Sequence, residues 1–222
     1  MATMPSRLET VEIAIGSLIN QVDRFYLFLD HFEKTPGFAN HEKIVVLTSE
    51  EHGDVRSAGK LLALEMDHQA DIYMTVDDDI LYPKNFTTRV TKALKKYDYE
   101  AVIGLHGCIL HESIESYRKD RTVIQLGNRL RRDQKVDVIG SGAMAFSPKK
   151  LRFDVKQWRH INTTDLQFAL EAKRRGLPLY SIARKRDWAR FLQKGQPDSI
   201  YNKLIKDDSR QTVLARELQG SG

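Results

Sequence analysis

Cysteine is almost absent from this sequence. The chain has 222 residues and a single cysteine, Cys108, so it cannot form an internal disulfide or a zinc site built from cysteine ligands. This composition fits a reducing compartment. We expect Cys108 to be a small, buried, apolar residue.

Long apolar runs are also lacking. No segment approaches the roughly 20 residues needed to cross a bilayer, and the first residues show neither a basic lead nor an apolar signal segment. We therefore expect a cytoplasmic protein. Peripheral association at the inner face of a membrane, or with a synthase complex, stays open. At this length we expect one domain rather than two.

The charge is unbalanced toward basic residues. The formal net charge is +5 and the pI is near 9.2, which favours anionic partners. Three basic clusters lie at residues 129–132, 173–175 and 184–186, without the interleaved aromatic residues that stack bases in single-strand binders. We expect no nucleic-acid partner. A polyanion-binding module remains the alternative from another functional class.

Short apolar strands alternate with helices in the first hundred residues. Strands are expected at residues 2–4, 24–29, 43–47, 71–77 and 101–104, and helices at 8–19, 58–68 and 85–96. Such alternation predicts an α/β domain with a mostly parallel central sheet and helices on both faces.

The pattern changes in the second half. Strands are expected at residues 122–126, 136–139, 143–146 and 179–182, with one helix at 163–175. Because most of these strands follow one another without a helix between them, we expect this half to be mixed or antiparallel.

An acidic triplet, Asp77, Asp78 and Asp79, follows the expected strand at 71–77. Side chains alternate along a strand, so Asp77 and Asp79 are expected on one side and Asp78 on the other. Adjacent carboxylates repel one another unless a cation or hydrogen-bond donors compensate, and Mg²⁺ or Mn²⁺ binds through such carboxylates. The sequence therefore predicts a metal site. A turn capped by Asp side chains is the alternative reading.

Polar residues follow four of the expected strands, at 3–7, Asp30, 53–60 and 77–79. In open α/β sheets, ligands bind beyond the carboxyl ends of the strands. We expect these four features to meet at one crevice.

With these residues in view, the chain resembles the GT-A nucleotide-sugar glycosyltransferases, particularly the bacterial family 2-like enzymes. The resemblance spans about residues 2–183 and rests on residues 2–7, on the Asp-Asp-Asp-Ile-Leu-Tyr-Pro run at 77–83 and on Thr164-Asp165-Leu166. It implies a single Rossmann-like GT-A domain at 1–184, followed by a basic, partly helical tail at 185–222. Within the domain, it implies a nucleotide-binding half of about 1–104 and an acceptor half of about 105–184.

The resemblance also implies roles for residues near the nucleotide. Thr3, Pro5 and Arg7 match the first strand-to-helix turn, beside the base, and Asp30 matches an acid that accepts a hydrogen bond from uracil. Lys60 matches a cation near the base or diphosphate. For Asp30 the alternative is a polar residue that only ends the strand, and for Lys60 it is a solvent-facing helical lysine.

At the acidic triplet, Asp77 matches a ribose contact and Asp79 the direct ligand of a Mn²⁺ or Mg²⁺ ion that bridges the donor phosphates. Asp78 is left as a structural residue or an indirect metal contact within the nucleotide-sugar site. Gly142, in a Gly-Ser-Gly stretch, is expected to let the sugar approach the backbone, with a β-bulge as the alternative. Many GT-A enzymes supply a C-terminal histidine to the metal, but no histidine follows His160 here.

Asp165 matches the catalytic base that activates the acceptor hydroxyl in inverting family 2 enzymes. The competing reading is helix capping, because residues 162–165 are all residue types that favour a helix N-terminus. A more usual motif has two acids in a row, and Thr164 replaces the first, which puts acceptor orientation in doubt.

The resemblance thus implies a metal-dependent glycosyltransferase that moves a sugar from a UDP-sugar to a saccharide or glycolipid hydroxyl, with inversion, in bacterial surface or capsular polysaccharide synthesis. A retaining GT-A enzyme and a nucleotidyltransferase remain open alternatives. Arg184, Lys185 and Arg186 are further candidates for diphosphate contacts, and Asp187 for a metal ligand. Trp158 and Trp188 are candidates for sugar stacking, against a core role for each.

Overall fold

The computed structural model describes residues 1–160, 162–193 and 204–220. Its first unit is a parallel sheet of three strands in the order β1 (Ala2–Thr3), β2 (Phe25–Leu29) and β3 (Ile44–Thr48). Helix α1 (Leu8–Leu18) connects β1 to β2 and buries Val11, Ala14 and Ile15 at helical spacing. The strand–helix–strand–strand order expected from the sequence is confirmed.

A second sheet has five strands in the order β4 (Tyr73–Val76), β11 (Ala143–Phe146), β6 (Val102–Gly104), β12 (Leu179–Ser181) and β9 (Gln134–Val136). β6 and β12 are parallel, and β11 runs antiparallel to both of its neighbours, β4 and β6. β4, β6 and β12 therefore share one direction, while β11 and β9 run the other way. The α/β fold with a mixed C-terminal half is confirmed.

Two smaller antiparallel sheets complete the strand set. One has the order β10 (Val138–Ile139), β7 (Gly107–Leu110) and β8 (Arg121–Ile124). The other pairs β5 (Ile80–Leu81) with β13 (Arg190–Phe191), so a segment of the expected tail returns to the residues that follow the acidic triplet.

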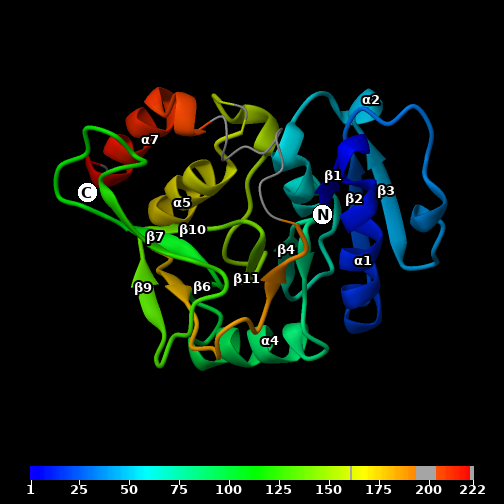
Figure 1. The fold of residues 1–222 in the computed structure, drawn as a ribbon, viewed down its shortest axis with the longest axis horizontal. Helices are drawn as coiled ribbons and strands as arrows, with labels where there is room; N and C mark the ends of the chain where they lie inside the picture. The colour runs from blue at the N-terminus through cyan, green and yellow to red at the C-terminus, as the bar shows by residue number, and fades with distance from the viewer. Residues whose placement is uncertain (161, 194–203, 221–222) are drawn as a thin grey trace.

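The other α-helices given by the described residues are α2 (Ser49–His52), α3 (Ala63–Met66), α4 (Phe86–Lys96), α5 (Thr164–Arg174) and α7 (Ser209–Gly220). Short 3-10 turns lie at Pro5–Arg7, Ile19–Gln21, Gly37–Ala39, Arg56–Leu61 and Val155–Gln157. In Figure 1, β1, β2, β3 and α1 form one side of the molecule, and α5 and α7 lie on the other.

The continuous helix expected at 58–68 is wrong. The chain forms the 3-10 turn Arg56–Leu61 and then the single turn of α3. At Gly59 a Cβ would lie 2.1 Å from Cδ1 of Phe28, so the turn is pressed directly onto the ring. The Lys60 carbonyl accepts a hydrogen bond from the Tyr73 hydroxyl at 2.9 Å. Tertiary contacts here override the helix-forming preference of the segment.

Alternate residues of β11 serve two apolar cores. Met144 and Phe146 belong to one, together with side chains of α5, whereas Ala143 and Ala145 belong to the other, together with side chains of α4. This alternation is that of a central strand whose two faces are both covered. The expectation of helices on both faces of the sheet is met, and Cys108 is buried as expected.

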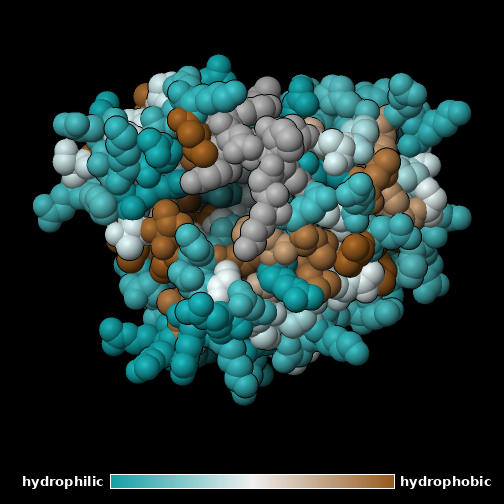
Figure 2. Space-filling view, viewed as in Figure 1, coloured by the Kyte–Doolittle hydropathy of each residue, from teal (hydrophilic) through white to brown (hydrophobic). Residues whose placement is uncertain are grey.

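The face seen in Figure 2 is mostly polar at its edges, with apolar residues gathered in a band across the middle. Among the described residues, no helix has both the length and the apolar character needed to span a membrane. Helix α7 is held to α5 by a hydrogen bond of 2.6 Å from Lys173 Nζ to the Leu218 carbonyl. The division into a domain at 1–184 and a tail at 185–222 stays a prediction.

Candidate active site

The acidic triplet lies in the turn between β4 and β5. β4 ends at Val76, so Asp77, Asp78 and Asp79 are not in the extended strand from which their alternation was expected. Burial nevertheless alternates, because Asp78 is 9% exposed while Asp77 and Asp79 are only half-buried. Exposure does not give the direction of a side chain, so the placement of Asp77 and Asp79 on one side stays a prediction.

Asp77 is fixed by a buried lysine. Lys60 is 5% exposed, and its ammonium forms an ion pair with Oδ1 of Asp77. The Asp77 amide donates to the Tyr82 hydroxyl at 2.8 Å, and this hydroxyl donates to the Gly142 carbonyl. The solvent-facing reading of Lys60 is therefore wrong. The short 3-10 turn, rather than a surface helix, points its side chain into the site.

The ion pair sets the charge of both partners. Burial acts to raise the pKa of Asp77, but the Lys60 ammonium outweighs it and the net pKa is lowered. Burial likewise acts to lower the pKa of Lys60, and the Asp77 carboxylate reverses this so that its net pKa is raised. Both groups are therefore ionised at neutral pH.

Asp78 and Asp79 have raised pKa values, because the lowering effects of Lys60 and Arg7 do not offset burial and mutual repulsion. Burial, with repulsion from Asp77, raises the pKa of Asp78 to about 6. Burial, with repulsion from Asp77 and Asp78, raises the pKa of Asp79 to about 7. Within the described part of the chain, the Asp79 carboxylate has no hydrogen-bond donor or ion-pair partner. Two oxygen-donor side chains that repel each other fit a hard divalent cation such as Mg²⁺ or Mn²⁺.

Gly142 faces Asp77. A Cβ at Gly142 would lie 2.2 Å from Oδ2 of Asp77, and the Asp77 amide donates to the Gly142 carbonyl at 3.2 Å. The glycine is therefore required for the close approach of the β10–β11 connection to the acidic turn. This requirement holds whether or not a sugar also approaches the backbone there.

Asp165 lies in the first turn of α5 and contacts the same connection. Its Oδ1 accepts a hydrogen bond from the Ser141 amide at 2.9 Å. The residue before it, Thr164, has its hydroxyl 2.8 Å from that of Ser57. The Thr163 side chain makes no cap hydrogen bond, and Asp165 is an acidic residue in the first turn of α5, so its catalytic role stays a prediction beside the helix-end reading.

His106 was missed by the sequence reading. It follows β6, and a Cβ at Gly140 would lie 2.0 Å from its Nε2, so the ring is packed against the glycine stretch. Burial lowers the pKa of His106, while the charges of Asp165 and Asp77 oppose this. Its position just past a strand end was the available signal, because Asp30 and the acidic triplet were chosen by the same rule.

The residues expected beside the base lie at the ends of the first parallel strands. Thr3 and Asp30 are 3% and 4% exposed, and the Asp30 amide donates to the Thr3 carbonyl at 2.9 Å. Pro5 and Arg7 form the 3-10 turn that follows β1. The positive charge of Arg7 lowers the pKa of Asp78 and of Asp79, against the larger raising effects. The first turn and the acidic turn are thus electrostatic neighbours.

Asp30 belongs to a second acidic group. Among the residues the structure describes, Asp30, His31 and Asp54 bring three possible ligand atoms within 4.8 Å of one another. Arg56 already supplies a cation there, since its Nε lies 2.8 Å from Asp54 and its Nη1 lies 3.5 Å from Asp30. The ring of His31 lies 2.7 Å from the other Asp30 oxygen.

One of the expected basic contacts, Arg184, is wrong. Arg184 is 3% exposed and donates to the carbonyls of Leu126, Gln125 and Ile182, so it holds the fold and has no role at a diphosphate. Its backbone also forms an isolated antiparallel bridge with Leu130, which lies between β8 and β9. Lys185 and Arg186 are exposed, and their role stays a prediction.

Asp187 and Trp188, which follow this basic run, were also candidate site residues. Trp188 packs on Phe86 at 6.1 Å between ring centroids and receives Arg89 at 4.7 Å, which fits the core reading. Asp187 is exposed and lies against Gly127, where a Cβ would meet its Oδ1 at 2.8 Å. As a metal ligand it stays a prediction.

Comparison with known proteins gives a structural match but no sequence match. No protein-family model matches the chain, and no curated protein matches it. Among solved structures, it is similar to a crystal structure of GalNAc-T7 with UDP, GalNAc and Mn²⁺, with a TM-score of 0.53 and 9% sequence identity. The chain has a GT-A-like fold. The match covers 94% of this chain and 51% of the other, so the chain spans about half of that protein's length. Membership of the bacterial family 2-like group stays a prediction.

Proposed function

We propose that the protein is a metal-dependent glycosyltransferase that uses a nucleotide sugar as donor. The observation that carries this proposal is the carboxylate of Asp79 in the acidic turn. It is half-buried, its pKa is raised, and it has no hydrogen-bond or ion-pair partner among the described residues. In a GT-A-like fold, the turn lies beyond the end of β4, where ligands of open α/β sheets bind. The structurally similar GalNAc-T7 was crystallised with UDP, GalNAc and Mn²⁺.

Asp79 would hold the Mn²⁺ or Mg²⁺ ion, with Asp78 behind it. The ion, when bound, acts as a Lewis acid that offsets the charge of the departing nucleoside diphosphate. The protein's part is to keep the Asp79 carboxylate in place without a competing cation. Lys60 is committed to Asp77, so its ammonium does not neutralise Asp79 in the manner of a direct ion pair.

Asp77 would contact the ribose of the donor. Its Oδ1 is held by Lys60, and its other oxygen faces Gly142. A carboxylate that is held at one oxygen and packed at the other loses little conformational freedom on accepting a hydroxyl group, which favours tight positioning. Thr3 and Asp30, at the adjacent strand ends, would lie beside the base, and Asp30 would accept the imino hydrogen of uracil. Pro5 and Arg7 would line the same side.

Asp165 would act as the base that takes the proton of the acceptor hydroxyl. The Ser141 amide fixes one of its oxygens at 2.9 Å, which leaves the other to accept a proton. Because Ser141 lies beside Gly142, this carboxylate and the donor-side carboxylate of Asp77 approach the same glycine stretch from two sides. Such an arrangement suits a direct displacement with inversion at the anomeric carbon.

The finer assignments follow from the resemblance. We propose UDP as the nucleotide, a saccharide or glycolipid hydroxyl as acceptor, and a role in bacterial surface or capsular polysaccharide synthesis. The association with a membrane or a synthase complex belongs to the same proposal, and the proposed setting is cytoplasmic.

Donor hydrolysis tests the proposal without knowledge of the acceptor. The protein is incubated with UDP-, GDP-, dTDP- and CMP-sugars, with and without Mn²⁺, and release of the nucleotide is measured. We expect Mn²⁺-dependent release from at least one UDP-sugar by the wild type, and none by Asp79→Asn. If no UDP-sugar is hydrolysed or bound while another class is, the nucleotide assignment is wrong.

The base assignment needs its own variant. Asp165→Asn should still bind UDP with Mn²⁺ but lose about 10²–10⁴-fold in turnover, the usual contribution of a general base. The matched control is Asp71→Asn, whose exposed carboxylate pairs with Lys149 away from the site. Wild-type turnover by Asp165→Asn excludes it as the base. A product with retained anomeric configuration, seen by NMR, contradicts inversion and favours the retaining alternative.

A further inference from the structure

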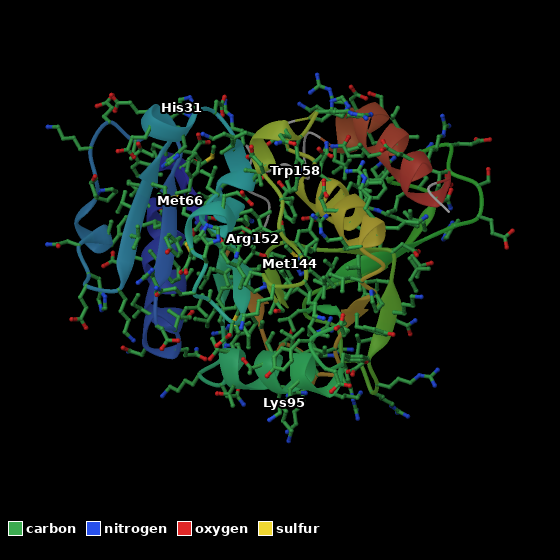
Figure 3. All side chains as sticks on the ribbon, turned by 180° about the vertical axis from the view of Figure 1, so that it is seen from behind. His31, Met66, Lys95, Met144, Arg152 and Trp158 are labelled. Atoms are coloured by element: carbon green, nitrogen blue, oxygen red, sulfur yellow. The ribbon has the colours of Figure 1, made fainter. Side chains whose placement is uncertain are left out.

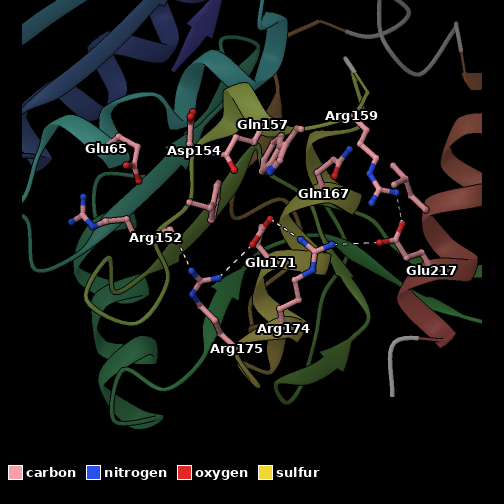
Figure 4. Close-up of a pocket in the computed structure, with 13 residues that line it drawn as sticks. Glu65, Arg152, Asp154, Gln157, Arg159, Gln167, Glu171, Arg174, Arg175 and Glu217 are labelled. Carbon is pink, nitrogen blue, oxygen red and sulfur yellow. Dashed lines mark hydrogen bonds and ion pairs between the residues drawn. The ribbon is translucent and has the colours of Figure 1, made fainter.

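A polar cavity lies apart from the acidic turn, whose aspartates are not among its lining residues. It has a volume of about 660 Å³ and is formed by α3, α5, α7 and residues 152–159 (Figure 4). Figure 3 shows Arg152 and Trp158, which line it, from the side opposite to the view of Figure 1. The volume falls in the range of small-molecule sites, about 300–1,000 Å³.

Helix α5 separates this cavity from the proposed catalytic site. Gln167, Glu171 and Arg174 line the cavity and recur at spacings of four and three residues, which places them on one face of the helix. Asp165 is two residues before Gln167, about 200° around the helix, and points to Ser141 instead. The same helix therefore carries two sites on two different faces.

Two buried N–H donors in the cavity lining have no acceptor among the residues that the structure describes. Gln167 is 7% exposed, and its Nε2 is buried without a hydrogen-bond partner among the described residues. The indole Nε1 of Trp158 is likewise buried and has no hydrogen-bond partner among the described residues. Buried polar groups in native proteins are nearly always paired, so these two donors call for acceptor oxygens supplied from the cavity.

Charged side chains around the cavity alternate in sign. Glu171 lies 3.0 Å from Arg174 and 3.4 Å from Arg175, and Glu217 lies 3.4 Å from Arg174 and 3.8 Å from Arg159. Figure 4 shows these contacts as a chain along the cavity. The four arginines of the lining are matched by Glu65, Asp154, Glu171 and Glu217. A phosphate or other anion therefore finds no net attraction here.

The cavity also has an aromatic wall. The ring of Trp158 stacks on Phe153 at 5.3 Å between centroids, with an angle of 25° between the planes, and Trp158 is half-buried. An indole that is stacked on one side presents a flat apolar surface on the other. Guanidinium and carboxylate groups next to it offer paired donors and paired acceptors in fixed planes.

We propose that this cavity binds a short neutral saccharide. A sugar supplies hydroxyl oxygens to Gln167 and Trp158, adjacent hydroxyls to the planar groups of the rim, and an apolar ring face to the indole. A charged ligand does not suit the balanced rim, and an apolar ligand leaves the buried donors unpaired. The binding site rests on the cavity's own chemistry. The role of this site would be to bind a part of the acceptor saccharide that is distant from the reacting hydroxyl. This role rests on the proposed function.

Saccharide binding to the whole chain tests this directly. Neutral oligomers of glucose, galactose, N-acetylglucosamine and N-acetylgalactosamine, with a uronic-acid oligomer beside them, are titrated without nucleotide and with a metal chelator present. Saturation-transfer NMR measures the binding. The chain has two tryptophans, so Trp188→Phe leaves Trp158 as the only indole and adds a fluorescence reading at the cavity.

We expect at least one neutral oligomer to bind and to change the Trp158 emission. Trp158→Phe keeps a ring but removes the donor, and Gln167→Met keeps the volume but removes the amide. Each should weaken binding about tenfold, the cost of one well-placed hydrogen bond. Trp188→Phe and Lys149→Met, which change residues outside the cavity, should bind like the wild type.

Several results overturn the proposal. These are no binding by any neutral oligomer, a preference for the uronic-acid oligomer, or unchanged affinity in Trp158→Phe. If Gln167→Met does not fold, as judged by its thermal transition, the Trp158→Phe result decides alone. Asp79→Asn separates the two hypotheses, because it should lose UDP binding with Mn²⁺ and keep saccharide binding in the chelator.

Discussion

At the scale of single residues, the acidic turn divides its charges between two uses. Asp77 is neutralised by Lys60, whereas Asp78 and Asp79 keep raised pKa values near 6 and 7. The fold therefore holds two carboxylates at a cost, since burial and mutual repulsion disfavour their ionised forms. This cost is what a bound cation would relieve. It predicts a measurable effect on stability even in the absence of substrate.

The first prediction concerns Asp79 and pH. Its folded pKa of about 7 exceeds the ordinary 3.8, so the folded state binds the proton more tightly than the unfolded state. Stability is therefore lost as pH rises from about 4 to about 7, and the loss is complete above that window. In the presence of a chelator, Asp79→Asn should melt above the wild type at pH 8, and the difference should vanish near pH 4.

Calorimetry across this pH range checks the prediction, and each kcal/mol of relieved repulsion corresponds to about 2–4 °C in a chain of this size. Asp71→Asn is the matched control, because its carboxylate lies in an exposed pair and should give no such pH dependence. Equal melting of wild type and Asp79→Asn at pH 8 would show that the carboxylate is not strained.

The second prediction concerns Lys60. Lys60→Met removes the only ion-pair partner of Asp77 among the described residues and leaves its half-buried carboxylate beside Asp78 and Asp79 without a counter-ion. We expect a loss of about 1–3 kcal/mol in the free energy of unfolding, because removing one partner of an ion pair leaves the other charge unpaired. Adding Asp77→Asn should restore part of this loss.

Urea unfolding of the two single variants and the double variant measures the coupling. Lys149→Met is the control, since Lys149 likewise pairs with an aspartate, Asp71, but this pair is exposed, and the unfolding midpoint of the variant should stay at the wild-type value. Additive effects of Lys60→Met and Asp77→Asn would contradict the account of the pair.

At the scale of elements, the β10–β11 connection joins the two sides of the site. Its residues contact Asp77 through Gly142, Asp165 through Ser141, and His106 through Gly140. A connection with such close approaches has little room for side chains. This explains why glycines flank Ser141 there. It also makes the connection a place where one added methyl group disturbs both the donor and the acceptor side.

The third prediction follows from this crowding. Gly142→Ala places a Cβ within 2.2 Å of Oδ2 of Asp77, so Asp77 must move away from Lys60. We expect a lower melting temperature and a loss of stabilisation by UDP with Mn²⁺. Gly16→Ala is the contrasting variant, because Gly16 lies inside α1 with no atom within 4 Å of its added Cβ.

Gly16→Ala should raise the free energy of unfolding by about 0.5–1 kcal/mol, the usual gain from replacing a helical glycine. Differential scanning fluorimetry compares the two variants. A Gly142→Ala protein with wild-type melting and wild-type UDP response would show that the acidic turn tolerates displacement of Asp77.

At the scale of the whole molecule, periodicity predicted the fold well because it depends on local patterns. The short apolar runs at residues 24–29 and 43–47 predicted β2 and β3, and a helix expected at residues 85–96, after Pro83, corresponds to α4. Strand-end rules led to Asp30 and Asp77, whose positions are set by backbone topology. Such rules predict which residues lie at the carboxyl end of a strand.

Contacts between distant segments were not predictable in this way. The burial of Lys60 depends on Gly59 meeting Phe28, and the role of Arg184 depends on carbonyls near residue 125. No local pattern encodes either approach. His106 lay within reach of the strand-end rule, and the rule was not extended to β6.

The central claim is that the acidic turn binds a nucleoside diphosphate through a divalent cation. Its most direct test is the thermal transition of the wild type with UDP and Mn²⁺ together, with each alone, and with a chelator. At 100-fold excess over Kd, we expect a rise of about 5–10 °C with both ligands, through linkage to the native state, and little with either alone. Asp79→Asn should show no rise. A wild type that UDP and Mn²⁺ together do not stabilise, or an Asp79→Asn protein that they stabilise equally, would contradict the account.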